Sequence, residues 1–217
     1  MINTVIFDLD GTLINSIDDL GDTVNKLLKK RNYPVHPKEA YYHFVGDGVI
    51  KLIERALPEN CHEDIMVLKK EFDEIYANNC LNKTKPYDGI VELLNKLKTA
   101  NYNLAIVTNK PQNHAIKIAK TFFPDTFAYI FGNSALQPKK PDPCLTNLVI
   151  NLFDVKKNEV VYIGDSDVDI QTAKNTKVKS IGVAWGFRGK EELINSNADI
   201  VVDRPQEIWG VINDWSK

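Results

Sequence analysis

Cysteine is scarce in this chain, and its few thiols stand apart from one another. The 217 residues include three cysteines, Cys61, Cys80 and Cys144, an odd number without the short spacings of a metal site. The four histidines do not pair with a cysteine or with each other at ligand spacing; they are His36, His43, His62 and His114. This pattern excludes a disulfide-stapled fold and a zinc site, and predicts reduced thiols.

The sequence also lacks a long apolar run and an excess of either charge. No stretch approaches the ~18 apolar residues that a membrane-spanning helix needs. Lys and Arg total 27 and Asp and Glu total 29, so a net charge of −2 gives no reason to expect nucleic acid or a membrane as a partner. The chain enters a strand-like segment directly after Met1-Ile-Asn-Thr4, without the features of a signal peptide, which predicts a cytoplasmic protein.

The order of apolar patterns predicts an α/β core interrupted by a helical insertion. A hydrophobic content of 43% and a length of 217 residues suit one large core with a smaller inserted domain. Residues 16–82 show only helical periodicity, whereas residues 1–15 and 83–217 alternate strand-like and helix-like segments. Such alternation predicts a parallel sheet with right-handed crossovers, formed by residues 1–15 and 83–217.

Individual elements can be assigned from the same patterns. We expect strands at residues 5–7, 104–108, 129–131, 160–163, 180–183 and 200–202. We expect helices at residues 15–30, 49–57, 65–81, 90–100, 112–122, 143–153, 170–175 and 191–196. The turn Gly46-Asp-Gly48 precedes the second of these helices.

Acidic residues follow two of the predicted strands. Asp8 and Asp10 lie in Val5-Ile-Phe-Asp-Leu-Asp-Gly-Thr12, while Asp165 and Asp169 end the segment Val160-Val-Tyr-Ile-Gly-Asp-Ser-Asp-Val-Asp169. Residues at the ends of buried parallel strands meet at the carboxyl edge of the sheet, where such folds bind ligands. Carboxylates gathered there repel one another unless a cation is bound. The sequence therefore predicts a divalent metal with oxygen ligands, most plausibly Mg2+.

The first acidic segment has the residues for nucleophilic attack on a phosphate. A metal-bound phosphate beside Asp8 would be placed for in-line attack, which gives an aspartyl-phosphate. Asp10 can then protonate the departing alkoxide and activate the hydrolytic water. Gly11 allows the chain to leave the strand sharply, and Thr12 offers a hydroxyl and a backbone N–H to an anion.

Three further segments complete this prediction. Thr108 and Asn109 end a strand and would supply a hydroxyl and an amide to phosphate oxygens, and Lys140, before Pro141, would supply a positive charge. We expect Asp165 to be a direct metal ligand. Asp169 would either bind the metal through water or orient Lys140.

A calcium-binding loop is the main alternative for the second acidic segment. Asp165-Ser-Asp-Val-Asp169 resembles the start of such a loop, but Ile170 and Thr176 occupy the positions that require glycine and glutamate. This alternative therefore fails. Asp167 is interpreted as part of a solvated turn.

These motifs in this order resemble the haloacid dehalogenase superfamily, specifically its Mg2+-dependent phosphatases with a helical cap. They are Asp8-Leu-Asp-Gly-Thr12, Thr108-Asn109, Lys140-Pro-Asp-Pro143 and Gly164-Asp-Ser-Asp-Val-Asp169. The resemblance implies a Rossmann-like core, a cap at residues 16–82, Asp8 as nucleophile and Asp10 as acid/base. It also implies that Asp8, the carbonyl of Asp10 and Asp165 hold the metal. The carboxylate at position 10 distinguishes phosphatases from the dehalogenases and transport ATPases of this superfamily.

Within these phosphatases, several stretches are similar to the phosphoglycolate phosphatases. They include Phe44-Val-Gly-Asp-Gly48, Pro86-Tyr-Asp-Gly89, Ile106-Val-Thr-Asn-Lys-Pro111 and Ala184-Trp-Gly-Phe-Arg-Gly189, while Asn15 departs from the aspartate common there. The similarity implies a small phosphorylated metabolite as substrate, 2-phosphoglycolate first. Gly46, Gly48 and Arg188 would then contact the substrate carboxylate. His43 lies near this loop and is more simply interpreted as a surface residue.

Other functions remain open from the sequence. A β-phosphoglucomutase-like hexose-phosphate mutase would share the scaffold, but such mutases carry a histidine where this chain has Leu20. Another small phosphometabolite or pyrophosphate could be the substrate, and an inert module that binds phosphorylated metabolites is a further alternative. We expect a monomer or a homodimer.

Overall fold

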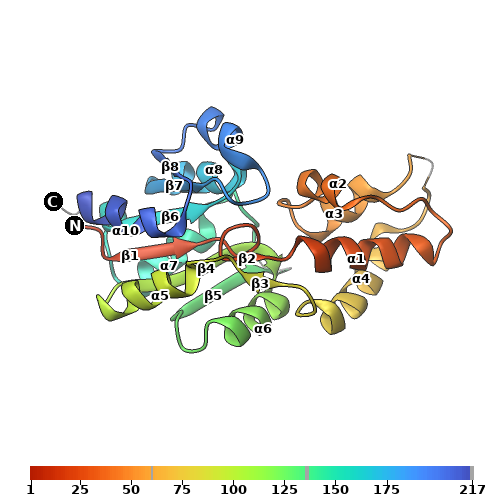
Figure 1. Ribbon diagram of the computed structural model, residues 1–217, viewed down its shortest axis with the longest axis horizontal. Helices are drawn as coiled ribbons and strands as arrows, with labels where there is room; N and C mark the ends of the chain where they lie inside the picture. Colours follow the sequence, from red (N-terminus) through yellow and green to blue (C-terminus); the bar gives the residue numbers. More distant parts are fainter. Residues whose placement is uncertain (60, 135–136, 216–217) are drawn as a thin grey trace.

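The computed structural model describes residues 1–59, 61–134 and 137–215, and it forms two lobes joined by paired linkers (Figure 1). The larger lobe contains a parallel sheet in the order β5-β4-β1-β6-β7-β8. Its strands are β1 (Thr4–Phe7), β4 (Asn103–Pro111), β5 (Tyr129–Asn133), β6 (Val160–Gly164), β7 (Lys179–Val183) and β8 (Ile200–Val202). The α/β fold class predicted from the sequence is confirmed.

Both faces of the sheet are buried because its strands are apolar throughout. Val5 and Phe7 point into one core cluster, while Ile6 points into the other, as the two-residue period of a strand requires. Buried residues of α5, α6 and α10 belong to the first cluster, and those of α7 belong to the second. The bounds of the helices in this lobe are α5 (Ile90–Thr99), α6 (Gln112–Phe122), α7 (Cys144–Leu152), α8 (Asp167–Thr176), α9 (Gly189–Asn195) and α10 (Pro205–Asp214).

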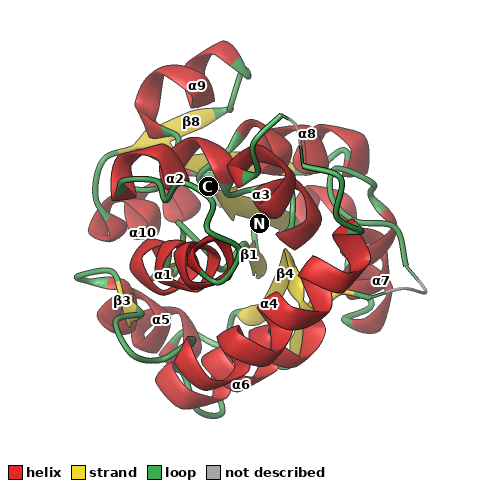
Figure 2. Ribbon diagram, turned by 90° about the vertical axis from the view of Figure 1, so that its right-hand side faces the viewer, coloured by secondary structure: helices red, strands yellow, loops and turns green. Residues whose placement is uncertain are grey.

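The smaller lobe is helical and lies over the carboxyl edge of the sheet. It consists of α1 (Ile17–Lys29), α2 (Lys38–Phe44), α3 (Val49–Ala56) and α4 (Ile65–Asn79). Figure 2 looks from this lobe toward the sheet and shows α1 and α4 in front of the strands. Leu20, Val24 and Leu27 of α1 and Leu68 and Phe72 of α4 are buried in a shared core. We refer to residues 16–82 as the helical lobe.

The two linkers between the lobes pair with each other. β2 (Ile14–Asn15) and β3 (Lys85–Pro86) form a short antiparallel ladder. Just inside the lobe, the buried carboxylate of Asp19 accepts hydrogen bonds from the backbone N–H groups of Lys83 and Thr84 and from the Thr84 hydroxyl, at 2.8–3.0 Å. Asp19 therefore ties the start of α1 to the returning chain.

Most expected elements are present within a few residues, and the differences have local causes. α2 was missed because its sequence, Lys-Glu-Ala-Tyr-Tyr-His-Phe, is rich in aromatic residues with poor helix propensity. α10 was missed although Pro205 begins it and Ile208 and Ile212 are buried. α8 begins at Asp167 rather than at residue 170, so Asp169 lies in its first turn. β4 continues beyond residue 108 to Pro111.

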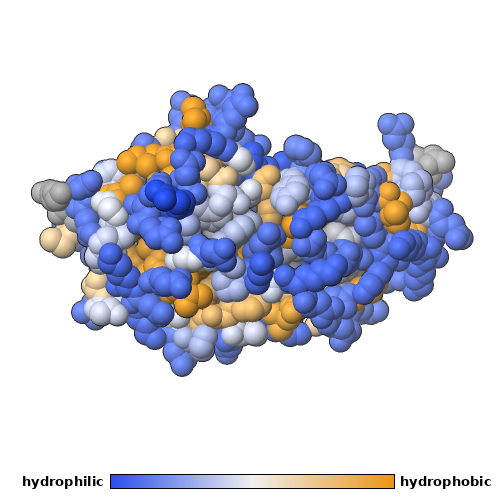
Figure 3. All heavy atoms as spheres, in the orientation of Figure 1, coloured by the Kyte–Doolittle hydropathy of each residue, from blue (hydrophilic) through white to orange (hydrophobic). Residues whose placement is uncertain are grey.

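The face of the molecule seen in Figure 3 is mainly hydrophilic. The apolar side chains on this face form small groups. None of the described helices combines the length and hydrophobicity that crossing a bilayer requires.

The role of Asp19 can be tested by mutation. Asp19→Ala would leave backbone N–H groups of the linker unpaired, so we expect the free energy of unfolding to fall by about 2–4 kcal/mol. Asp22→Ala is the matched control, because Asp22 contacts the same residue through an exposed ion pair with Lys83 Nζ, which stabilises the fold little. Urea denaturation measures both, and equal losses would contradict this account.

Candidate active site

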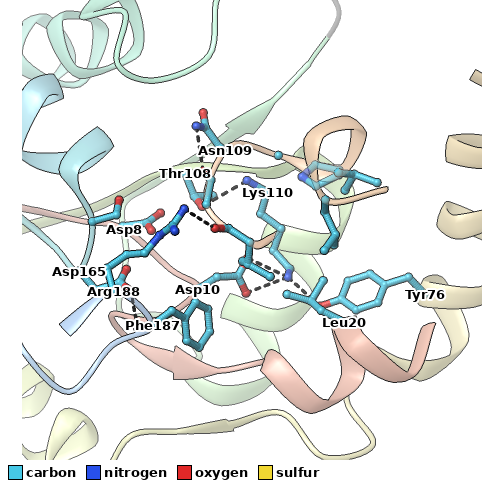
Figure 4. A pocket seen from close by; sticks show the side chains of 17 residues that line it. Asp8, Asp10, Leu20, Tyr76, Thr108, Asn109, Lys110, Asp165, Phe187 and Arg188 are labelled. Atoms are coloured by element: carbon cyan, nitrogen blue, oxygen red, sulfur yellow. Dashed lines mark hydrogen bonds and ion pairs between the residues drawn. The ribbon is translucent and has the colours of Figure 1, made fainter. Parts of the chain in front are cut away.

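The carboxyl edge of the sheet gathers three buried carboxylates. Asp8 directly follows β1, Asp165 directly follows β6, and Asp169 lies in the first turn of α8. One carboxylate oxygen of each lies within 4.8 Å of the others. Figure 4 shows Asp8 and Asp165 near each other at the core side of a pocket. The structure thus brings together predicted site residues from opposite ends of the chain.

Three glycines make room for these carboxylates. A Cβ atom at Gly11 or Gly186 would collide with the side chain of Asp165, and a Cβ at Gly164 would collide with that of Asp169. Gly11 also adopts a φ of +83°, which favours glycine. Gly11 was expected to form a sharp turn, and its closeness to Asp165 is an additional reason for glycine at this position.

The cluster carries more negative than positive charge. Burial raises the pKa of Asp8 to about 6, and burial also raises the pKa of Asp165, with further contributions from Asp169 and Asp8. Lys140 Nζ lies 2.8 Å from Asp8 Oδ1 and 2.6 Å from Asp169 Oδ1, and these carboxylates keep its pKa high despite burial. Asp8 Oδ1 is buried, and its contact with the Lys140 ammonium is an ion pair that is not aligned as a hydrogen bond. An all-oxygen cluster that one ammonium cannot neutralise fits a divalent cation such as Mg2+.

Both carboxylate oxygens of Asp169 accept hydrogen bonds, and these bonds hold Lys140 in position. Its Oδ2 accepts hydrogen bonds from the backbone N–H (3.1 Å) and the hydroxyl (2.7 Å) of Ser166, which caps α8. Its Oδ1 accepts the bond from Lys140 Nζ. Of the two roles left open by the sequence, metal ligand through water or orientation of Lys140, these contacts favour the second.

Asn109 fixes the backbone of Lys140. Its Oδ1 accepts a hydrogen bond from the Lys140 N–H at 2.8 Å, and its Nδ2 donates to the Lys140 carbonyl at 3.2 Å. The side-chain amide expected to meet phosphate oxygens is therefore engaged with the chain itself. Thr108 is buried beside Asp8 and favours the charged form of its carboxyl, which lowers the pKa of Asp8 against the larger effect of burial, while the Thr12 hydroxyl donates to Asp165 Oδ1 at 3.3 Å.

The carboxylate of Asp10 points toward a second ammonium and lies apart from the cluster of Asp8, Asp165 and Asp169. Its oxygens lie 2.9 and 3.0 Å from Lys110 Nζ, and its Oδ1 also accepts a hydrogen bond from Ser16 Oγ at 2.5 Å. Lys110 Nζ further donates to the hydroxyl of Tyr76 in α4, at 2.7 Å. Asp10 and Tyr76 outweigh burial and raise the pKa of Lys110.

Sequence reasoning missed Lys110, Ser16 and Tyr76. Lys110 follows Thr108-Asn109 directly, but the predicted strand ended at residue 108 and placed the lysine in a loop. The position of Lys110 between an apolar strand and Pro111 was the feature of the sequence that could have indicated a site residue. No comparable signal marks Tyr76, because it occupies a core position on the apolar face of α4.

The pocket lies between the sheet edge and the helical lobe. It encloses about 600 Å3, part of it open to solvent, and reaches from Asp8 to Arg188. The helical lobe contributes mainly apolar and glycine residues: Leu20, Val45, Gly46, Gly48, Val49, Leu52 and Tyr76. Both predicted cap glycines therefore line it, with φ values of +125° for Gly46 and +90° for Gly48.

Side chains of the core hold the loop at residues 43–48 through its carbonyl oxygens. Arg188 donates from Nη2 to Val45 O at 2.9 Å and from Nη1 to His43 O at 3.4 Å. Lys139 Nζ donates to Asp47 O at 3.0 Å, and Asn109 Nδ2 lies 3.4 Å from Gly46 O. The side chain of His43 is exposed and does not line the pocket.

Comparison with known proteins agrees with this architecture. A family model described as haloacid dehalogenase-like hydrolase matches residues 5–183. A phosphoglycolate phosphatase of Vibrio parahaemolyticus is 32% identical over 97% of this chain and 96% of its own length, and one of Psychrobacter arcticus is 34% identical over 89% and 88%. The crystal structure of a predicted phosphoglycolate phosphatase from Haemophilus somnus superposes with a TM-score of 0.90 at 29% identity, covering 97% of both chains.

A parallel sheet with a buried acidic cluster at its carboxyl edge, covered by a helical lobe, defines a class of hydrolases. The chain belongs to the haloacid dehalogenase-like hydrolase family. It is a phosphoric monoester hydrolase, as the sequence predicted.

The charge of the cluster predicts how metal binding depends on pH. Because the pKa of folded Asp8 is about 6, above the unfolded value of 3.8, the metal-free protein loses stability as pH rises through about 6. Mg2+ competes with protons for these oxygens, so it should stabilise the protein more at about pH 7.5 than at about pH 5. At saturation we expect Tm to rise by roughly 5 °C at the higher pH.

Differential scanning calorimetry with and without Mg2+ measures this effect. Asp165→Asn removes one oxygen anion from the cluster and should abolish most of the shift. An equal shift at both pH values, or a larger one at low pH, would contradict the assignment of the cluster as a metal site.

Proposed function

We propose that this enzyme hydrolyses a small phosphate monoester with Mg2+ through an aspartyl-phosphate on Asp8, and that 2-phosphoglycolate is its substrate. The observation that carries the proposal is the buried carboxylate of Asp8, which lines the pocket and whose Oδ1 forms a 2.8 Å ion pair with Lys140. The names of the curated relatives support the choice of substrate.

The arrangement of the core suits phosphoryl transfer. Asp8, the backbone carbonyl of Asp10 and Asp165 would hold the metal, which supplies positive charge to the phosphate oxygens. Asp8 attacks phosphorus as the nucleophile, and Lys140 neutralises charge beside it. Thr108 and the backbone at the start of the Asp10–Thr12 turn offer hydrogen bonds to the phosphate.

Asp10 serves both halves of the reaction. It gives a proton to the departing oxygen of the ester and later takes one from the water that hydrolyses the aspartyl-phosphate. Lys110 and Ser16 fix the direction of its carboxylate. The helical lobe, which we assign as the cap at residues 16–82, closes the pocket and limits access of other water.

Leu20 favours hydrolysis over the mutase reaction. It lines the pocket and is 4% exposed, at the position where the related mutases carry a histidine. A hydrocarbon side chain cannot transfer a proton to or from a sugar hydroxyl. We therefore propose the phosphatase rather than the hexose-phosphate mutase.

The proposed nucleophile is tested by substitution. Asp8→Asn removes the attacking oxygen anion and should lower Mg2+-dependent phosphate release by more than about 10³-fold. Asp167→Asn is the control, because Asp167 lies near the cluster in sequence but is exposed, and it should retain activity. Turnover by Asp8→Asn at the wild-type rate, or undiminished activity in excess chelator, would refute the mechanism.

The proposed substrate is tested by a panel of phosphorylated metabolites that includes pyrophosphate and β-glucose 1-phosphate. We expect 2-phosphoglycolate to have the highest kcat/KM. Accumulation of glucose 6-phosphate from β-glucose 1-phosphate would instead support the mutase, and a higher rank for another ester would reassign the substrate.

A further inference from the structure

Among the described residues that line the pocket, two have cationic side chains, Lys110 and Arg188. We propose that Lys110, together with Tyr76, binds a second anionic group of the substrate, one carbon away from the oxygen that leaves. This inference rests on the proposed phosphatase function, and it replaces Arg188 with Lys110 as the residue that selects the substrate.

Lys110 and Tyr76 form a buried pair of donors. The Lys110 side chain is 2% exposed, and its ammonium contacts Asp10 and the Tyr76 hydroxyl (Figure 4). Because an ammonium can only donate, the Tyr76 oxygen accepts in this contact and keeps its own O–H available. A carboxylate that displaces the 2.7 Å contact between them would meet a charged donor and a neutral donor, and hydrogen bonds to a charged donor are the stronger kind.

The position of Lys110 sets the distance at which an anion is recognised. Asp10 is the group that contacts the leaving oxygen in the proposed reaction, and Lys110 Nζ lies 2.9 Å from it. A carboxylate joined to the ester oxygen through a single methylene would therefore reach the same ammonium. Leu20 and Tyr76 also line the pocket, and their side chains would limit the room for a longer leaving group.

The part of the pocket lined by the helical lobe offers an anion few hydrogen-bond donors. Leu20, Val49 and Leu52 contribute hydrocarbon from the helical lobe. An anion placed against these side chains loses its hydration and must recover it from a buried donor. Among the described lining residues of the helical lobe, Tyr76 is the one whose side chain can donate a hydrogen bond.

The terminal nitrogens of Arg188 bind the loop at residues 43–48, and its buried Nε has no hydrogen-bond partner. Its two terminal nitrogens donate to the carbonyls of His43 and Val45, and the carboxylates of Asp47 and Glu192 lie within 4.0 Å of the guanidinium. These contacts hold the loop at residues 43–48 against the core. We therefore assign Arg188 to closure of the cap, which would assist every substrate equally.

The test compares 2-phosphoglycolate with 2-phosphoglycolamide, which has the same shape but no charge on the second group. The measured quantity is the ratio of kcat/KM for the acid to that for the amide. We expect Lys110→Met to lower this ratio by roughly 10- to 100-fold and Tyr76→Phe to lower it by a smaller factor. Arg188→Gln should lower kcat/KM for both esters while leaving their ratio near the wild-type value.

Several outcomes would overturn the inference. They are a wild-type enzyme that does not prefer the acid, a Lys110→Met ratio equal to that of wild type, and a ratio that collapses in Arg188→Gln instead. Lys110→Gln, with its thermal melting recorded, provides a second variant of similar length if the methionine variant does not fold. A purely structural role of Lys110 would reduce activity toward both esters and leave the ratio unchanged.

Failure of the proposed function gives a different result. p-Nitrophenyl phosphate has a leaving group that departs without protonation and carries no second anion. If the wild-type enzyme with Mg2+ releases phosphate from none of these esters, the phosphatase proposal fails. In that case calorimetry measures the affinity of the Asp8→Asn variant for the acid and for the amide. The inference requires that the acid binds more tightly and that this preference is lost when Lys110→Met is added.

Discussion

Mutual repulsion among buried carboxylates is the constraint on which the rest of this structure depends. Asp8, Asp165 and Asp169 bring their oxygens within 4.8 Å of one another at the end of a sheet whose strands are apolar on both faces. Charges placed in such surroundings are costly unless opposite charge is supplied. Lys140 supplies one positive charge, and in our proposal a divalent cation would supply the rest.

Much of the local structure serves to maintain this arrangement. Asn109 holds the backbone of Lys140, and Ser166 holds the carboxylate of Asp169, so that the ammonium is directed at Asp8. Glycines allow the close approach that side chains would prevent. The helical lobe contributes no carboxylate to the cluster; its contribution to the pocket is largely apolar, and its loop at residues 43–48 is bound through backbone carbonyls. In the proposed function, the core therefore carries out the chemistry, and the contact between the core and the helical lobe selects the substrate.

The sequence predicted the features that depend on strand order and chemical type. Apolar runs followed by acids were enough to indicate the parallel sheet and to place Asp8 and Asp165 at one edge of it. The contacts of Lys110 could not be predicted because they depend on the direction of a side chain at the end of β4 and on a tyrosine from a distant helix. Arg188 was expected to contact substrate, yet its hydrogen bonds to loop carbonyls depend on how the two lobes approach each other. Contacts between lobes leave no periodic pattern in the sequence.

The central claim, that the acidic cluster holds one divalent cation in contact with the nucleophile, is tested most directly by locating the cation in a crystal. Crystals soaked with Mn2+ in place of Mg2+ would give an anomalous signal. The account predicts a single strong peak within about 2.0–2.3 Å of a carboxylate oxygen of both Asp8 and Asp165. A peak elsewhere with both aspartates free of metal, or no peak at saturating Mn2+, would contradict it.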